Sequence, residues 1–408
     1  KLLERVKADG FAATMEAIAY TWFNRLVALR YMELHGYFDH GYRVLSHPDD
    51  QARPEILDHA ADVELQGLDR AKAVALKLDG TKDEELYRLL LKAQCNALHR
   101  AMPFLFDAIG GATELLLPAN LLHTDSLVRK LVESIDESAW EQIEIIGWLY
   151  QFYISEKKDQ VIGKVVKSED IPAATQLFTP NWIVKYMVQN TLGAQWLATY
   201  PHSPLKGQME YYIKPAEQTA EVKAQLEAIT PNVLNPEELT LMDPACGSGH
   251  ILVEAYDLFK AIYLERGYRP RDVAKLILEK NLFGLDIDGR AAQLAGFSLM
   301  MKGRADDRGL FERGVKVNVM ALLDSDQLSV KRISGGLRLA EHGVDEGDLT
   351  EIKALFAHAT TFGSLIQVPS AVVGTLPKLK ALASVKTDDW ALSKDLAVLR
   401  TLVGQAEM

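Results

Sequence analysis

Cysteine is scarce in this chain, and only Cys95 and Cys246 occur among the 408 residues. Cys95 stands in a helical-looking stretch and Cys246 in a glycine-rich one, so neither a disulfide framework nor a cysteine-based metal site is available, and a cytoplasmic location is expected. Four histidines match no metal-ligand spacing and are interpreted as surface or hydrogen-bonded core residues: His35, His40, His47 and His99. No metal site is therefore predicted.

Long apolar runs and excess positive charge are also lacking. No run of about 18 or more apolar residues and no signal-peptide pattern occurs, so no membrane partner is predicted. The net charge of −11 argues against a chain whose whole surface binds a polyanion, because phosphate contacts come from Lys and Arg. Any DNA contact is then a local patch or lies outside these residues. The chain begins with Lys1 rather than Met, and we interpret it as the N-terminal part of a longer protein.

The chain does contain a glycine-rich signature, Asp-Pro-Ala-Cys-Gly-Ser-Gly, at residues 243–249. It follows a short apolar run and precedes an apolar-periodic segment, a pattern that predicts a strand leading into a helix. Gly247 and Gly249 lack a Cβ, so a ligand can lie against the backbone where the next helix points its free N–H groups. Asp243 adds an acceptor at the carboxyl end of the strand, where open α/β sheets bind ligands. We predict a site for a small molecule that carries positive charge.

This signature resembles that of the S-adenosylmethionine-dependent amino (adenine-N6) DNA methyltransferases found in type I and related restriction-modification enzymes. The resemblance implies an α/β fold, with a Rossmann-like methyltransferase core that binds S-adenosylmethionine. A glycine-rich turn of another α/β protein is the alternative. A dinucleotide-binding turn fits worse, because the third Gly of that motif is absent and the next candidate acid is about twice as far away as the ~20 residues expected.

A second core strand is predicted at residues 282–286, followed by a helix over residues 289–299. An acid at the end of such a strand can accept both hydroxyls of a ribose. By resemblance, Asp286 takes this role and Ile287 packs on the adenine. Asp288 is the competing acid, but we interpret it as the cap of the next helix.

Upstream, Phe178-Thr179-Pro180 precedes an apolar segment. Thr179 is a good N-cap and Pro180 a good first residue, so a helix is predicted to begin there. Alone, this is an ordinary helix cap. In the resembled methyltransferases, a Phe-Thr-Pro helix start contacts the methionine end of the cofactor.

A third strand is predicted at residues 315–320. The related enzymes often place an Asp or Asn near its end to bind the cofactor's adenine amine, and here Met320, Asn318 and Asp324 stay open. No catalytic residue is assigned. The expected cofactor contacts are Phe178, Thr179, Pro180, Asp243, Pro244, Ala245, Cys246, Gly247, Ser248, Gly249, Asp286, Ile287 and Met320.

The remaining sequence is mostly of helical pattern. Residues 2–153 look helical almost throughout, with a first apolar stripe that starts at Phe11 and ends near Gly36. The aromatic run 147–153 is either core or a base-stacking platform, and the proline-containing residues 199–235 form an excursion without an assigned role. The expected division is a helical N-terminal domain (1–165), an incomplete cofactor-binding core (166–330) and a helical insertion (331–408).

The resemblance can be narrowed to the PglX (BrxX) family of adenine-specific methyltransferases of BREX phage-exclusion systems. It covers most of residues 1–325 and is carried by residues 11–34, 150–158 and 174–182, besides the glycine signature. It implies a site-specific DNA adenine-N6 methyltransferase that acts on double-stranded DNA, mostly through contacts outside this chain, and works with other phage-defence proteins.

One expected motif is missing. The resembled enzymes polarise the adenine amine with Asn-Pro-Pro-aromatic after a fourth strand, but the only Asn-Pro here, Asn235-Pro236, precedes the first strand. We therefore expect residues 1–408 to be inactive alone, with the motif within roughly two dozen residues beyond Met408. A non-catalytic S-adenosylmethionine-binding subunit and a methyltransferase for another substrate, such as a protein amide, are the alternatives.

Overall fold

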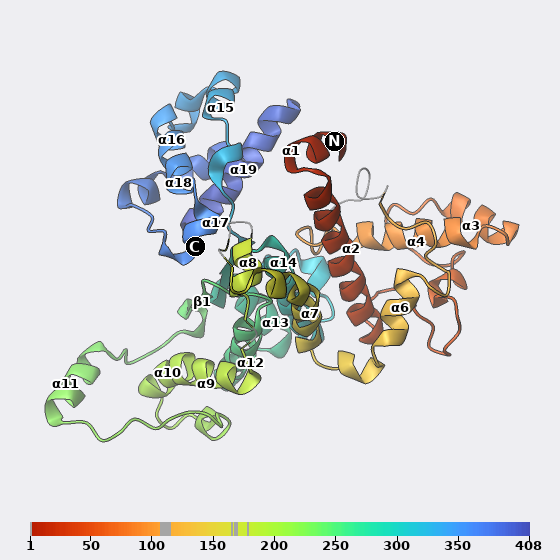
Figure 1. Ribbon diagram of the computed structural model, residues 1–408. Helices are drawn as coiled ribbons and strands as arrows, with labels where there is room; N and C mark the ends of the chain where they lie inside the picture. The colour runs from red at the N-terminus through yellow and green to blue at the C-terminus, as the bar shows by residue number, and fades with distance from the viewer. Residues whose placement is uncertain (1, 107–115, 165, 167–169, 178) are drawn as a thin grey trace.

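The computed structural model describes residues 2–106, 116–164, 166, 170–177 and 179–408. A small parallel sheet lies between two groups of helices, one from each end of the chain (Figure 1). The first group holds α1 (Leu2–Asp9), α2 (Phe11–Leu34), α3 (Arg70–Asp79), α4 (Asp83–Leu98), α6 (Leu127–Ser134) and α7 (Glu144–Val161). The last group holds α15 (Val330–Gly336), α16 (Glu346–Leu355), α17 (Ala359–Phe362), α18 (Ser370–Ala383) and α19 (Trp390–Glu407).

The middle of the chain supplies the sheet and its covering helices. Its helices are α8 (Ile171–Thr175), α9 (Asn181–Val188), α10 (Ala194–Thr199), α11 (Ala220–Ile229), α12 (His250–Glu265), α13 (Pro270–Leu276) and α14 (Gly289–Asp306). Its strands are β1 (Leu241–Asp243), β2 (Leu282–Asp286) and β3 (Asn318–Ala321). The second strand and the helix after the glycine signature are as predicted. The third strand is shorter than predicted.

The first helical stripe is confirmed by α2, but the prediction of nearly continuous helix over residues 2–153 is wrong. Between α2 and α3 the only regular element is the short 3-10 helix Glu55–Leu57. The buried carboxylate of Glu33 accepts backbone N–H groups from Val44 (2.8 Å) and Leu45 (2.7 Å). A charged acceptor satisfies these groups as a helix would, so a non-helical segment can be buried here.

The three strands are parallel in the order β1-β2-β3, with Asp243 opposite Gly284 and Asp286 opposite Ala321. Their carboxyl ends therefore share one edge of the sheet. Side chains alternate across it, as in any strand. On β2, Gly284 faces Leu252 of α12, whereas Leu285 belongs to the apolar cluster formed with the C-terminal helices. Helices thus cover both faces of β2.

The N-terminal helices share one hydrophobic core with the sheet. A single cluster of buried apolar residues runs from α2 and α4 through α12 to α14. The rings of Tyr31 in α2 and Phe297 in α14 meet edge-on, with centroids 6.1 Å apart. The C-terminal helices form a second cluster, which reaches the sheet at Leu285 and near β3 at Leu322. The first group of helices is therefore packed against α14 and shares the core on that face of the sheet.

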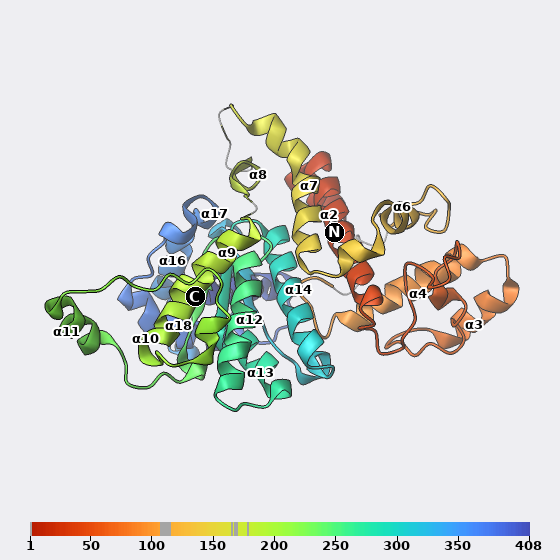
Figure 2. The same ribbon diagram turned by 90° about the horizontal axis from the view of Figure 1, so that it is seen from below.

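The predicted excursion before the first strand is an arm that carries α11. Both views show it extending away from the rest of the molecule (Figures 1 and 2). None of the ten residues of α11 is buried. Among the described residues, no helix has the length and apolar character needed to cross a membrane.

Candidate functional site

The glycine signature forms the turn between β1 and α12. The Cys246 N–H donates to the Leu285 carbonyl of β2 (2.9 Å), which ties the turn to the neighbouring strand. Gly247 and Gly249 have φ angles of +53° and +90°, in the region that favours glycine. A Cβ on Gly249 would lie 3.0 Å from the Cα and Cβ of Ala295 in α14. A Cβ on Gly247 would have no described atom within 4 Å. Gly249 thus serves packing, whereas Gly247 faces open space.

The Asp286 carboxylate meets this turn from the end of β2. One oxygen accepts the Gly247 N–H (2.7 Å) and the other the Asp288 N–H (2.8 Å). Burial raises the pKa of Asp286, and the nearby charges of Asp288 and Asp243 raise it further. Burial likewise raises the pKa of Asp243, which accepts the Ala245 N–H (3.1 Å). Two buried acids therefore flank the turn.

Asp288 caps the following helix, as predicted. Its Oδ1 accepts the Arg290 backbone N–H (2.9 Å) and the Arg290 Nε–H (3.0 Å). Its Oδ2 accepts the hydroxyl of Tyr150 in α7. The interpretation of residues 147–153 as core holds for Tyr150, which is buried, but not for Trp148 and Phe152, which are 54% and 77% exposed.

The predicted helix after Thr179 begins one residue later than expected. Pro180 is the N-cap of α9, and no side chain caps the helix, so the predicted Thr179 cap is wrong. Phe178 lies outside the described residues. Helix α9 lies beside α12. Burial raises the pKa of Glu254 in α12, and the nearby charge of Lys185 in α9 opposes this rise. Farther along both segments, a Cβ on Gly193, beyond α9, would lie 3.6 Å from Leu258 of α12. Because α9 and α12 run in the same direction, Thr179 lies at the end of the core that carries the glycine turn.

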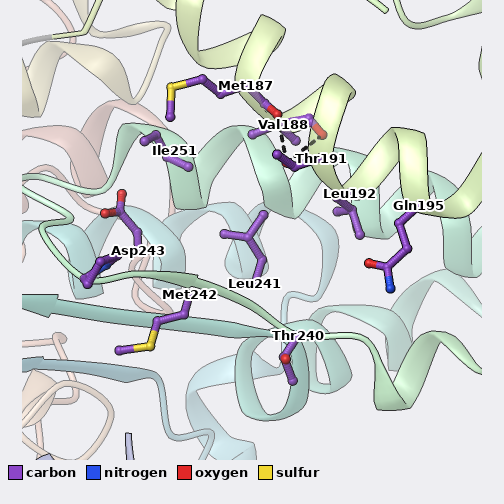
Figure 3. Close-up of a pocket in the computed structure, with 11 residues that line it drawn as sticks. Met187, Val188, Thr191, Leu192, Gln195, Thr240, Leu241, Met242, Asp243 and Ile251 are labelled. Carbon is purple, nitrogen blue, oxygen red and sulfur yellow. Dashed lines mark hydrogen bonds between the residues drawn. The ribbon is translucent and has the colours of Figure 1, made fainter. Parts of the chain in front are cut away.

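A cavity of about 440 Å³ opens between β1 and α9, and Asp243 is one of the residues that line it (Figure 3). Figure 3 shows side chains from α9, the π-helical turn Gln189–Gly193 and α10 on one side, and from β1 and the residue before it on the other. The lining residues are Met187, Val188, Thr191, Leu192, Gln195, Thr240, Leu241, Met242, Asp243, Pro244 and Ile251. Only Asp243 and Pro244 were predicted from the sequence. The cavity adjoins the glycine turn but does not reach Asp286.

The three open candidates on the third strand lie in different surroundings. Asn318 is the first residue of β3, and its amide donates to the Glu279 carbonyl (3.0 Å), at the sheet edge opposite the glycine turn. Asp324 accepts the backbone N–H (2.8 Å) and hydroxyl (2.7 Å) of Thr360. Met320 packs against α19, since a Cβ on Gly404 would come within 2.8 Å of its Cε. Asn318 is thus at the wrong end of the sheet for the adenine contact.

Comparison with known proteins identifies the class of domain. Residues 223–312 match the family described as N-6 DNA Methylase, and the matched residues include the glycine turn, β2 and Asp286. The chain therefore carries an N-6 DNA methylase domain.

The similarity to two named proteins extends over nearly the whole chain. The chain is 56% identical over 409 residues to the adenine-specific methyltransferase BrxX of Escherichia coli O9:H4 (strain HS), covering 94% of this chain and 34% of that protein. It is 37% identical over 389 residues to the adenine-specific methyltransferase PglX of Lacticaseibacillus casei (strain Zhang), covering 90% and 31%. The predicted resemblance to these methyltransferases is confirmed, and the chain spans about a third of their length.

Proposed function

We propose that this chain is the S-adenosylmethionine-binding part of a DNA adenine-N6 methyltransferase of a phage-defence system of the BREX type, acting in the cytoplasm. The observation that carries the proposal is the hydrogen bond of 2.7 Å between the Gly247 N–H and Asp286, which brings the two sequence signatures together. We refer to the region around this bond, at the carboxyl ends of β1 and β2, as the crevice, because Rossmann-like sheets bind nucleotides there. The names of the two relatives support the reaction.

The residues of the crevice fit this cofactor. The space beside Gly247 lets an adenosine lie against the backbone. The hydroxyl of Ser248 is buried and has no hydrogen-bond partner among the described residues. Each oxygen of Asp286 accepts one N–H and keeps a lone pair for a ribose hydroxyl. The buried acids Asp243 and Asp286 favour a ligand that brings positive charge, as a sulfonium does.

Each group then has a role in holding the cofactor. Asp286 accepts the ribose hydroxyls. Ile287 packs against the adenine. Its side chain also contacts the C-terminal helices, since it lies 3.7 Å from the position of a Cβ on Gly363. Thr179 and the first turn of α9 hold the methionine end beside Asp243. When bound, S-adenosylmethionine supplies the methyl group on its sulfonium.

A non-catalytic cofactor-binding subunit is the second candidate, and the position of Asn235-Pro236 favours it for these residues taken alone. The side chain of Asn235 accepts the Glu237 N–H (3.1 Å), and the Pro236 carbonyl accepts from Asn281 (2.7 Å), which precedes β2. This dipeptide therefore lies at the amino ends of the strands, away from the crevice. Double-stranded DNA and other defence proteins are then engaged mostly by further residues.

Titration calorimetry tests the proposal directly. The 408-residue chain, shown to be folded by circular dichroism, is expected to bind S-adenosylmethionine and S-adenosylhomocysteine with one site per chain. Adenosine should bind more weakly, because it lacks the methionine end held near Asp243. Folded protein that gives no heat with either cofactor form would overturn the assignment.

Replacement of the ribose acceptor gives a graded test. Asp286→Ala removes a charged acceptor worth about 1.5–3 kcal/mol per hydrogen bond, so the Kd for S-adenosylmethionine is expected to rise about tenfold to a hundredfold. Asp257→Ala, on the exposed face of α12, is the matched control and should leave the Kd unchanged. Asp288→Ala is a poor control, although its sequence position suggests a lesser effect, because Asp288 caps α14 and accepts from Tyr150. Equal Kd values for Asp286→Ala and Asp257→Ala would refute the ribose role.

A further inference from the structure

A buried hydrogen bond joins the N-terminal helices to the turn after β2. Tyr150, in the middle of α7, is fully buried and donates its hydroxyl to Oδ2 of Asp288. Asp288 is itself buried, and its other oxygen is held by the N–H and Nε–H of Arg290. Both oxygens of Asp288 are therefore occupied, and the carboxylate is fixed in one orientation.

Two further hydrogen bonds connect Asp288 to the glycine turn. The Asp288 backbone N–H donates to Asp286 Oδ1 (2.8 Å), and Asp286 Oδ2 accepts from Gly247 (2.7 Å). Four residues thus form an unbroken line from α7 to the turn between β1 and α12. Tyr150 is therefore linked to Asp286, the acid at the end of β2, through the single residue Asp288.

A second helix of the N-terminal group holds the same turn. The guanidinium of Arg290 lies over the ring of Tyr20 in α2, 3.9 Å from its centroid. The Nη1 atom of Arg290 is 3.7 Å from Oε1 of Glu16, one turn earlier in α2. Burial raises the pKa of Tyr150 far above its ordinary value, so its hydroxyl keeps the proton it donates. The turn at 286–290 is thus fixed from outside the sheet by α2 and α7.

We propose that Tyr150 is a positioning residue for the cofactor: its hydroxyl fixes the turn that presents Asp286 and Ile287, so the packed N-terminal helices set the cofactor affinity. The inference rests on the proposed function and deepens it. It assigns a task to helices that have no other role in the crevice. If α7 moved away from Asp288, Asp286 and Ile287 would still be present, but their turn would be held less firmly.

Tyr150→Phe tests the inference because it removes one oxygen and keeps the ring. The Kd for S-adenosylmethionine is expected to rise about threefold to thirtyfold, the range by which residues without ligand contact alter a coupled site. Tyr256→Phe is the matched control, because the Tyr256 hydroxyl donates to Asp306 (2.9 Å) between α12 and the last residue of α14, away from the crevice. The Kd of this variant should stay within about twofold of the parent value, although both variants lose a tyrosine–aspartate hydrogen bond.

Hydrogen exchange separates positioning from general stability. In Tyr150→Phe, the amides of Gly247 and Asp288 should exchange faster, whereas in Tyr256→Phe they should match the parent chain. Equal Kd values for the two variants, or unchanged exchange in Tyr150→Phe, would overturn the positioning role. If the parent chain binds no cofactor, the proposed function fails instead, and the exchange measurement still decides whether Tyr150 fixes the turn.

Discussion

Residues 1–408, purified as one chain, are expected to bind S-adenosylmethionine yet to form no N6-methyladenine in DNA. Methyl transfer to an adenine amine needs acceptors that draw its protons and a surface that stacks on the extruded base. The crevice supplies groups for the donor, whereas the only Asn-Pro lies at the opposite end of the strands, where its side chain and carbonyl are already hydrogen-bonded. The expected transfer is therefore below detection.

The measurement is mass spectrometry of nucleosides after incubation with unmethylated bacterial and phage DNA. An unrelated adenine methyltransferase of known activity serves as the assay control. N6-methyladenine formed by the 408-residue chain itself, and lost in Asp286→Ala, would place the amine acceptors among these residues. The proposed division between donor binding and catalysis would then be wrong.

The substitution Gly249→Ala is expected to be strongly destabilising. The residue has a φ of +90°, and a Cβ there would lie 3.0 Å from the backbone Cα of Ala295, which cannot rotate away. Left-handed strain of about 1–2 kcal/mol adds to an overpacking cost of about 1–3 kcal/mol. The free energy of unfolding, measured in urea, should fall by about 2–5 kcal/mol.

Gly247→Ala is the matched comparison. Gly247 also has a positive φ, but a Cβ there meets no described atom, so only the strain of about 1–2 kcal/mol applies. Its main effect should be on cofactor affinity, because the added methyl occupies the space assigned to the ligand. A larger loss of stability for Gly247→Ala than for Gly249→Ala would show that the two glycines have been assigned the wrong roles.

Local patterns in the sequence predict the core elements best. Residues 282–286 form β2 at the predicted bounds, because the apolar run and the acid that ends it are neighbours in sequence. The third strand starts at Asn318 rather than at residue 315, because its pairing begins opposite Phe283, and a local pattern does not show which residues of two strands pair. The helix α18 lies within the predicted helical insertion, but the sequence analysis gave it no bounds of its own.

The candidate site likewise contains residues that a local sequence pattern predicts and residues that it does not. The glycine turn, Asp286 and the Asp288 cap depend on neighbours in sequence, so their spacing reveals them. Tyr150 lies 138 residues before Asp288, and no periodicity links the two. The cavity beside β1 was missed for the same reason, because its walls come from α9 and the strand, which are distant in sequence.

The edge of β1 has a practical consequence for handling the protein. Among the described residues β1 pairs only with β2, and Met242 on this strand remains 41% exposed beside the open cavity. A free parallel edge presents unpaired N–H and C=O groups that accept any extended segment. The same edge in a neighbouring molecule can pair with it, so concentrated solutions of residues 1–408 are expected to self-associate, which light scattering at rising protein concentration would measure. Dilution, or a charged residue in place of Met242, is expected to reduce this association, because like charges on two edge strands repel each other.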